Sequence, residues 1–165
     1  MNENLQRVDH AAITANQLTI ITLTIAAFIL NAPWLVALVA LTMLAGTVLR
    51  MPGFLFLYRY LLKPARLMKP HILLDNPEPH RFAQGFGGVV LLIATLALFA
   101  GATLFGWAMV WLVAALAALN AFGGFCAGCF LYYWLSRLKV PGFYKNPPAG
   151  IIPGMRPKES VADES

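Results

Sequence analysis

Two long stretches of the sequence, residues 11–49 and residues 82–136, contain no Lys, Arg, Asp or Glu. A helix crosses the apolar core of a bilayer in about 20 residues, so each stretch is long enough for two crossings. Neither stretch shows the polar face, repeated at helical period, that a water-soluble helix needs. Charged residues make up only 12% of the chain, whereas a typical soluble domain contains about 25%. The sequence predicts an all-α integral membrane protein.

Each stretch must turn back once to form a helical hairpin. The first is interrupted at Asn31, Ala32 and Pro33, since Asn and Pro favour turns and Pro suits the first position of a helix. The second is interrupted over residues 101–106, which begin and end with Gly. We therefore expect four transmembrane helices as two hairpins, at about residues 15–30, 33–49, 82–100 and 107–135.

These helices would form one transmembrane domain over residues 15–140. A short segment, residues 1–14, precedes this domain, and residues 50–81 form the long connection between the two hairpins. Residues 141–165 are rich in Pro, Gly and charge, a composition that predicts a poorly ordered tail.

The basic residues predict the orientation of the helices. The two hairpin turns contain no Lys or Arg, whereas the connection contains six of them and the segment after residue 136 contains five. Basic residues beside membrane spans stay on the cytoplasmic side, so both termini and the connection are expected in the cytoplasm. The net charge of +5 is explained by these flanking residues, and we expect no nucleic-acid partner.

The two halves of the chain resemble each other. The triplet at residues 56–58, Phe-Leu-Tyr, recurs at residues 130–132, and Trp34 corresponds to Trp107. Because both halves would start in the cytoplasm, the pattern predicts a parallel internal repeat about an axis along the membrane normal.

The repeat leaves two alternatives for the second helix. In one, the helix is prolonged from residue 49 to about residue 63 and is kinked at Pro52 and Gly53, because a proline inside a helix removes a backbone hydrogen bond. In the other, the helix ends at Leu49 and residues 54–62 form a separate helix at the membrane interface.

The two cysteines of the chain, Cys126 and Cys129, lie three residues apart in the fourth expected helix. On a continuous helix this spacing places both sulfur atoms on one face. The opposite face would carry Asn120, Gly124 and Gly128, a small-residue pattern that lets membrane helices pack closely. We therefore expect helix packing, and a homo-oligomer, through these three residues.

Three roles fit the cysteine pair. Buried cysteines often act as small apolar residues in packing. Two thiols at this spacing also suit redox chemistry, because one sulfur can resolve a disulfide or persulfide formed by the other. The third role is a metal site completed by His80 or His10, although structural zinc needs four ligands. The sequence favours dithiol chemistry, with no metal and no cofactor expected.

Three residues outside the pair are candidates for supporting roles. Burial disfavours a thiolate, and Arg50 could offset this as a nearby cation or could simply anchor the helix end. His80 could carry a proton, since the unperturbed pKa of histidine is about 6.5, or could lie at the membrane rim. Gln84, like Asn120, is the kind of polar residue that more often joins membrane helices than binds a substrate.

The segments "EPHRFAQ" (78–84) and "GFCAGCFLY" (124–132), with "VDH" at residues 8–10, resemble an uncharacterised bacterial family, domain of unknown function four-three-nine-five. The resemblance covers about residues 7–138 and implies a four-helix protein of the bacterial cytoplasmic (inner) membrane. The resemblance also implies a link to thiol-redox or sulfur-handling proteins, near which some relatives are placed. Cys126, Cys129, His80 and Gln84 match its motif positions, and no established activity comes with the resemblance.

The expected function is that of a membrane dithiol protein. Cys126 and Cys129 would exchange electrons or sulfane sulfur with a cytoplasmic partner of thioredoxin or rhodanese type, supported by Arg50 and His80. The alternative is a non-enzymatic membrane subunit, such as a channel, a carrier component or an assembly partner, whose cysteines only pack.

Overall fold

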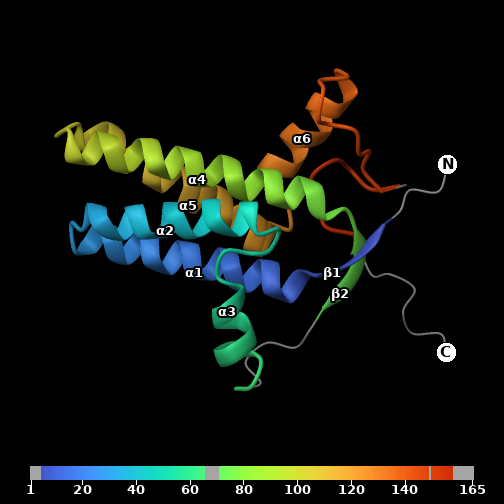
Figure 1. The fold of residues 1–165 in the computed structure, drawn as a ribbon, viewed down its shortest axis with the longest axis horizontal. Helices are drawn as coiled ribbons and strands as arrows, with labels where there is room; N and C mark the ends of the chain where they lie inside the picture. The colour runs from blue at the N-terminus through green and yellow to red at the C-terminus, as the bar shows by residue number, and fades with distance from the viewer. Residues whose placement is uncertain (1–4, 66–70, 149, 158–165) are drawn as a thin grey trace.

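The computed structural model describes residues 5–65, 71–148 and 150–157, and it is built around a bundle of long helices (Figure 1). The remaining residues, which belong to the expected N-terminal segment, connection and tail, lie outside the described part of the chain. In chain order the elements are β1 (Gln6–Asp9), α1 (His10–Ile29), α2 (Pro33–Val48), α3 (Leu55–Leu57), the π-helical turn η1 (Tyr58–Leu62), β2 (Ile72–Asp75), α4 (Pro77–Phe99), α5 (Thr103–Gly123) and α6 (Ala127–Arg137).

Three of these helices, α1, α4 and α5, are long and apolar enough to cross a membrane, and α2 is apolar but shorter. The outer surface of the bundle is apolar too, with Leu41, Leu96 and Leu104 exposed. A surface of this kind suits lipid rather than water. The prediction of a mainly helical chain is therefore confirmed, and the helices indicate a membrane protein.

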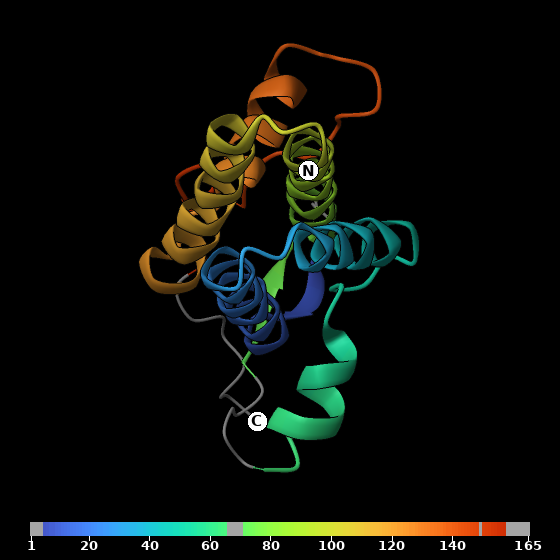
Figure 2. The ribbon, with the colours of Figure 1, turned by 90° about the vertical axis from the view of Figure 1, so that its left-hand side faces the viewer.

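The four long helices form a closed ring in which α1 packs on α2, α2 on α4, α4 on α5 and α5 on α1 (Figure 2). Each helix contributes at least one fully buried apolar side chain to the centre, namely Ile20, Val36, Leu91 and Val110. The first hairpin turns where expected, and α2 begins at Pro33 as predicted. The second turns at residues 100–102, at the start of the predicted interruption.

Two short strands, which the all-α prediction did not include, pair at one end of the bundle. β1 and β2 are antiparallel, with Gln6 opposite Asp75 and Asp9 opposite Ile72. Each strand leads into a long helix: Asp9 caps α1 by accepting a hydrogen bond from the Ala11 N–H. The pairing therefore holds the first turns of α1 and α4 beside each other.

α1 and α4 each begin five residues before the predicted helix, at His10 and Pro77 instead of residues 15 and 82. The start signals lie ahead of the apolar runs, because an aspartate side chain caps α1 and a proline occupies the first position of α4. α5 likewise begins at Thr103 rather than residue 107.

The first bend, residues 49–54, follows α2 and shows that the prolonged helix was wrong. α2 ends at Val48, and Arg50 adopts a positive φ of 61°. Gly53 folds back against α2, where an added Cβ would lie 2.8 Å from the Thr42 carbonyl oxygen. A separate short helix, α3 with η1, follows, as the alternative with the shorter second helix expected.

The second bend, residues 124–126, contradicts the prediction of one helix over residues 107–135. Gly124 ends α5 with a φ of 66° and a ψ of 12°, the left-handed conformation that glycine favours at helix ends. α6 then starts after Cys126 and leans away from the bundle on the side opposite α3 (Figure 1). Asn120, Gly124 and Gly128 therefore do not line one face of a single helix.

The described part of the tail contacts the second bend. Over the described part of residues 141–165, the chain folds back and forms an antiparallel bridge between Met155 and Phe125 of the second bend. Backbone hydrogen bonds join Gly154 and Arg156 to the same bend. Contacts with the bend, which the composition of the tail does not reveal, hold this segment in place.

Candidate functional site

The candidate site lies at the second bend, where Cys126 and Cys129 form a disulfide. Cys126 is the N-cap residue of α6, and Cys129 lies in the first turn of that helix. Their exposed fractions are 5% and 3%, so the disulfide is buried. The two sulfur atoms lie close together, as the spacing of the cysteines predicted. The cysteines lie at the start of a helix, however, rather than in the middle of a membrane span.

The start of α6 favours negative charge on Cys126. The Cys129 backbone N–H donates a hydrogen bond to the Cys126 sulfur at 3.1 Å. The free N–H groups at a helix start carry a partial positive charge and stabilise anions there. Once the disulfide is reduced, the helix would therefore stabilise a thiolate on Cys126, and the thiolate is the reactive form of cysteine.

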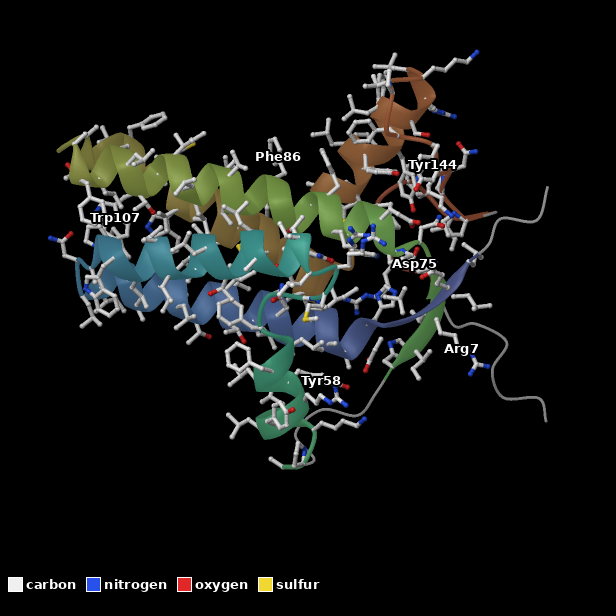
Figure 3. The ribbon with its side chains drawn as sticks, viewed as in Figure 1. Arg7, Tyr58, Asp75, Phe86, Trp107 and Tyr144 are labelled. Carbon is white, nitrogen blue, oxygen red and sulfur yellow. A yellow bond between two sulfur atoms is a disulfide. The ribbon has the colours of Figure 1, made fainter. Side chains whose placement is uncertain are left out.

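A histidine and a carboxylate continue the site beyond the second sulfur. His80 Nδ1 lies 3.4 Å from the Cys129 sulfur, and His80 Nε2 lies 2.9 Å from Asp75 Oδ2. Asp75 is the last residue of β2, at the strand end of the bundle, with Trp107 at the opposite end (Figure 3). The sulfur, the imidazole ring and the carboxylate thus form a continuous relay.

Asp75 is buried but surrounded by groups that stabilise its charge. His10 Nε2 lies 3.2 Å from Asp75 Oδ2, and the Asn76 N–H donates to Oδ1 at 2.7 Å. Burial by itself would raise the pKa of Asp75, but the His10 and His80 rings facing the carboxylate outweigh it and hold the pKa below its usual range. The charged carboxylate orients His80 with its Nε2 toward Asp75 and its Nδ1 toward Cys129.

A segment of the tail covers the disulfide. We call residues 152–156 the strap. The Cys126 N–H donates to the Gly154 carbonyl at 2.7 Å, and the Arg156 N–H donates to the Gly124 carbonyl at 2.8 Å. The Arg156 guanidinium also donates to Thr14 Oγ1 at 3.2 Å, which ties the strap to α1. A large partner can reach the disulfide from this side only if the strap moves.

Two cavities reach Cys126 from the bundle side. The large cavity, of about 260 Å³, lies between β1, the start of α1, the first bend and the start of α4. The inner cavity, of about 90 Å³, lies deeper among α1, α4 and α5. Asn16, Gln17, Gln84 and Asn120 line both cavities. The buried disulfide therefore borders space that a small molecule can occupy.

The family described as "Domain of unknown function (DUF4395)" matches residues 8–137, which is most of the chain. The chain belongs to the DUF4395 family. The matched region contains the disulfide, His80, Asp75 and His10, and it ends before the strap. No curated protein and no solved structure gave a match.

Most of the residues singled out in this DUF4395 chain lie near the disulfide. His80 contacts the Cys129 sulfur directly. Arg50 lines the large cavity together with Cys126, but the described residues show no hydrogen bond between its guanidinium and either sulfur. Gln84 holds the first bend, donating to the Met43 carbonyl at 3.0 Å and accepting from the Gly53 N–H at 3.2 Å.

The three predicted packing residues have separate positions. Asn120 is buried near the end of α5, and Gly124 forms the second bend. Only Gly128 lies at a close helix contact, where an added Cβ would come within 2.7 Å of the Ala83 Cα atom of α4. This contact lies within one chain and seats α6 against α4.

Two groups of side chains could hold a metal ion. One consists of Cys126, Cys129 and His80, and the other of His10, Asp75 and His80, with the ligand atoms of each group within 4.8 Å of one another. The first group offers thiolate ligands only when the disulfide is reduced. It supplies three of the four ligands that structural zinc needs. The predicted pairing of His80 with the cysteines is therefore present, whereas His10 lies on the Asp75 side of His80.

Sequence reasoning missed Asp75 and the strap. Asp75 directly precedes the helix-start signal of α4, and a carboxylate five residues before His80 was the available hint. The strap offers a weaker signal, since only Gly154, with a φ of 85°, marks the place where the tail meets Cys126.

Proposed function

We propose that the chain is a membrane thiol–disulfide exchange protein whose Cys126–Cys129 pair passes two electrons to or from a thiol partner. One observation carries the proposal: the pair occupies a helix start, and the sulfur of Cys129 contacts the imidazole of a His80–Asp75 pair. Packing alone requires no thiolate-stabilising helix start and no oriented histidine. The family match supplies no activity, so the geometry is the support.

The reaction begins with an attack on Cys126. A partner thiolate forms a bond to the Cys126 sulfur, the Cys126–Cys129 bond breaks, and its electron pair stays on the Cys129 sulfur. The His80 imidazolium, held by Asp75, donates its Nδ1 proton to that leaving thiolate. A second partner thiolate then releases the partner disulfide and leaves Cys126 as the thiolate. Overall, two thiols and the protein disulfide become one disulfide and the protein dithiol.

The reverse direction uses the same groups. His80 then accepts the proton of Cys129, whose thiolate resolves a mixed disulfide on Cys126. A sulfane sulfur carried as a persulfide on Cys126 would be resolved in the same way: the Cys129 thiolate bonds to the Cys126 sulfur, the bond to the outer sulfur breaks, and that sulfur leaves as hydrosulfide. The partner protein we propose is a cytoplasmic thiol protein of thioredoxin or rhodanese type, which would reach Cys126 from the side of the strap.

The proposal includes a topology. All four long helices cross the bacterial inner membrane, α2 with them, and both termini and the disulfide lie on the cytoplasmic side. The density of Lys and Arg around the strand end of the bundle supports this orientation. The chain would also assemble as a homo-oligomer through its apolar outer surface.

A parallel internal repeat belongs to the same proposal. Each half runs from a strand through two long helices and a bend into a short helix: β1, α1, α2, α3 with η1, and then β2, α4, α5, α6. The two strands pair antiparallel, which is what a twofold axis between the halves requires. The matched Phe-Leu-Tyr triplets begin in α3 and α6, the short helices.

Trapping of a covalent adduct tests the function. In Cys129→Ala, a partner or a sulfur atom attached to Cys126 cannot be resolved, so mass spectrometry of the protein purified from membranes should find it. Cys126→Ala is the matched control and should hold no adduct. In the wild type, the pair should cycle between dithiol and disulfide in graded redox buffers, seen by thiol trapping on gels.

The opposite outcome identifies the alternative, a subunit whose cysteines only pack. In that case neither variant carries an adduct, and the wild-type pair does not respond to redox buffers in the intact bundle. Both alanine variants would then be as stable as each other and would behave as packing variants.

A further inference from the structure

The large cavity carries more positive charge than negative charge. Arg7 of β1, Arg50 of the first bend and Arg81 of α4 all line it, and Asp9 is the acidic residue in its wall. The oxygens of Asp9 are engaged with the Ala11 N–H, the His71 N–H and the Tyr58 hydroxyl. Three arginines therefore contribute to the cavity wall, against one carboxylate that already has partners.

The arginines have unused hydrogen-bonding capacity. Within residues 5–65, 71–148 and 150–157, none of the three forms an ion pair with a carboxylate. The Arg81 Nε atom is buried and has no hydrogen-bond partner among the described residues. A buried donor without a partner costs about 1–3 kcal/mol. A ligand that accepts a hydrogen bond from Arg81 would remove this cost.

Two of the amide side chains of the cavity have partners elsewhere. Gln84 uses both its oxygen and its nitrogen on the first bend, and Asn16 accepts the Phe54 N–H at 2.9 Å. The permanently cationic groups in the wall, which would select an anion, are the arginines. Guanidinium groups bind carboxylates, sulfonates and phosphates through paired hydrogen bonds.

The volume of the cavity approaches that of small-molecule sites, and the cavity wall includes Cys126. Its volume of about 260 Å³ lies just below the range of about 300–1,000 Å³ that is typical of small-molecule sites. Cys126, the cysteine whose thiolate α6 would stabilise, lies in its wall. A ligand held by the arginines would therefore border the sulfur that the proposed exchange uses.

We propose that the large cavity binds a small organic anion that bears a thiol, and that this thiolate attacks Cys126 directly. The inference rests on the proposed exchange function and names one of its substrates. The ligand thiolate forms a mixed disulfide with Cys126 and displaces Cys129, which takes its proton from His80. A second molecule of the anion releases the symmetrical disulfide, so two electrons enter the protein pair. The strap stays in place throughout, because the ligand arrives from the bundle side.

A charge series of thiols tests this assignment. The probes are 2-mercaptoethanesulfonate, 2-mercaptoethanol and cysteamine, which share one thiol chain and carry a negative, a neutral and a positive end. The rate of reduction of Cys126–Cys129 is measured on the full chain in a neutral detergent and divided by the thiolate concentration of each probe. We expect the anion to react about tenfold faster than the neutral thiol, and cysteamine to react most slowly.

Arginine variants test whether the cavity causes the preference for the anionic thiol. Arg50→Gln, at an exposed position, and Arg81→Gln should each reduce the ratio of the anionic to the neutral rate severalfold. Arg59→Gln, an exposed arginine of η1 outside the cavity, should leave the ratio unchanged. Ethanesulfonate, which has no thiol, should slow the anionic probe more than it slows 2-mercaptoethanol.

Two negative results are distinguishable. If all three thiols reduce the pair at equal corrected rates and the arginine variants change nothing, the anion site is overturned while the exchange function stands. If no thiol of any charge reduces the pair, the exchange function itself fails.

Discussion

The two bends of the molecule occupy equivalent places and are held in different ways. In the first bend, side chains of the bundle satisfy the backbone: Gln84 accepts from the Gly53 N–H, and Asn16 accepts from the Phe54 N–H. In the second bend, the strap satisfies the Cys126 N–H and the Gly124 carbonyl, and the Cys126 sulfur satisfies the Cys129 N–H. One bend is tied to the helices, and the other to a chain segment that lies outside the family match.

The first bend is thus a structural joint, whereas the second bend contains the groups proposed to react. Loss of the bundle contacts at the first bend would leave buried N–H groups without partners and would loosen α2 from α4. The proposed function exchanges the partners of the second bend: a large partner would displace the strap, and the sulfur would change its bond. The proposed chemistry therefore sits in the bend whose rearrangement least disturbs the helix ring.

The largest expected effect is on the second bend and comes from the relay. His80→Gln removes the group that donates to and accepts from Cys129, so exchange with 2-mercaptoethanol should slow about 100-fold, in line with general acid–base catalysis. The rise of the rate with pH should also follow thiolate formation alone. His71→Gln, an exposed histidine, is the matched control. An equal rate in His80→Gln would reduce the relay to a structural contact.

The next effect should fall on the first bend. Gln84→Ala leaves the Gly53 N–H without its acceptor, which should lower the free energy of unfolding by about 1–3 kcal/mol, measured as a loss of thermal stability in detergent. Gln6→Ala, on β1, is the comparison. The midpoint potential of the cysteine pair should not change. A change in potential with no loss of stability would contradict the separation of the two bends.

A smaller effect should appear when the strap is loosened. Gly154 has a φ of 85°, and an added Cβ would lie 2.9 Å from the Cys126 carbonyl oxygen. Gly154→Ala therefore disfavours the closed strap by about 1–2 kcal/mol, so the reduced pair should react about 5–30 times faster with a bulky maleimide. Gly142→Ala has a similar φ of 94° and open space around it, and its alkylation rate should match the wild type.

The smallest expected effect concerns acid stability at the relay. The pKa of Asp75 is lower in the folded chain than its unperturbed value of 3.8, so its contribution to stability is present above pH 4 and is lost as pH falls. Between pH 4 and pH 3 the loss should be about 1 kcal/mol. In Asp75→Asn this part of the acid dependence should vanish, whereas Glu78→Gln should retain it. Thermal unfolding at a series of pH values measures both.

Part of the site could be read from the sequence, because its signals are local. The spacing of Cys126 and Cys129 and the position of His80 before an apolar run singled out three of the residues that meet. The second bend could also have been predicted, because glycine is common at helix ends and the sequence has two in succession, Gly123 and Gly124. The unbroken apolar run masked it, because hydrophobicity does not distinguish one helix from two.

The remaining parts could not be found this way because they join distant segments. Asp75 meets His80 only because β2 ends where α4 begins, and His10 meets Asp75 only because β1 pairs with β2. The strap reaches Cys126 from almost 30 residues further along the chain. Contacts of this kind bring together residues that lie far apart in the chain, and a single sequence carries little signal for them.

The sequence by itself determined that this chain is helical and has an apolar exterior, because a segment without charges must satisfy its own backbone hydrogen bonds when it is out of water. It also determined that two sulfur atoms lie within one helical turn of each other. Only the tertiary structure decided that they meet at a helix start, beside an oriented histidine and a cavity lined by arginines. The reason is physical: local spacing limits which atoms can meet, but the packing of distant segments decides which of them do.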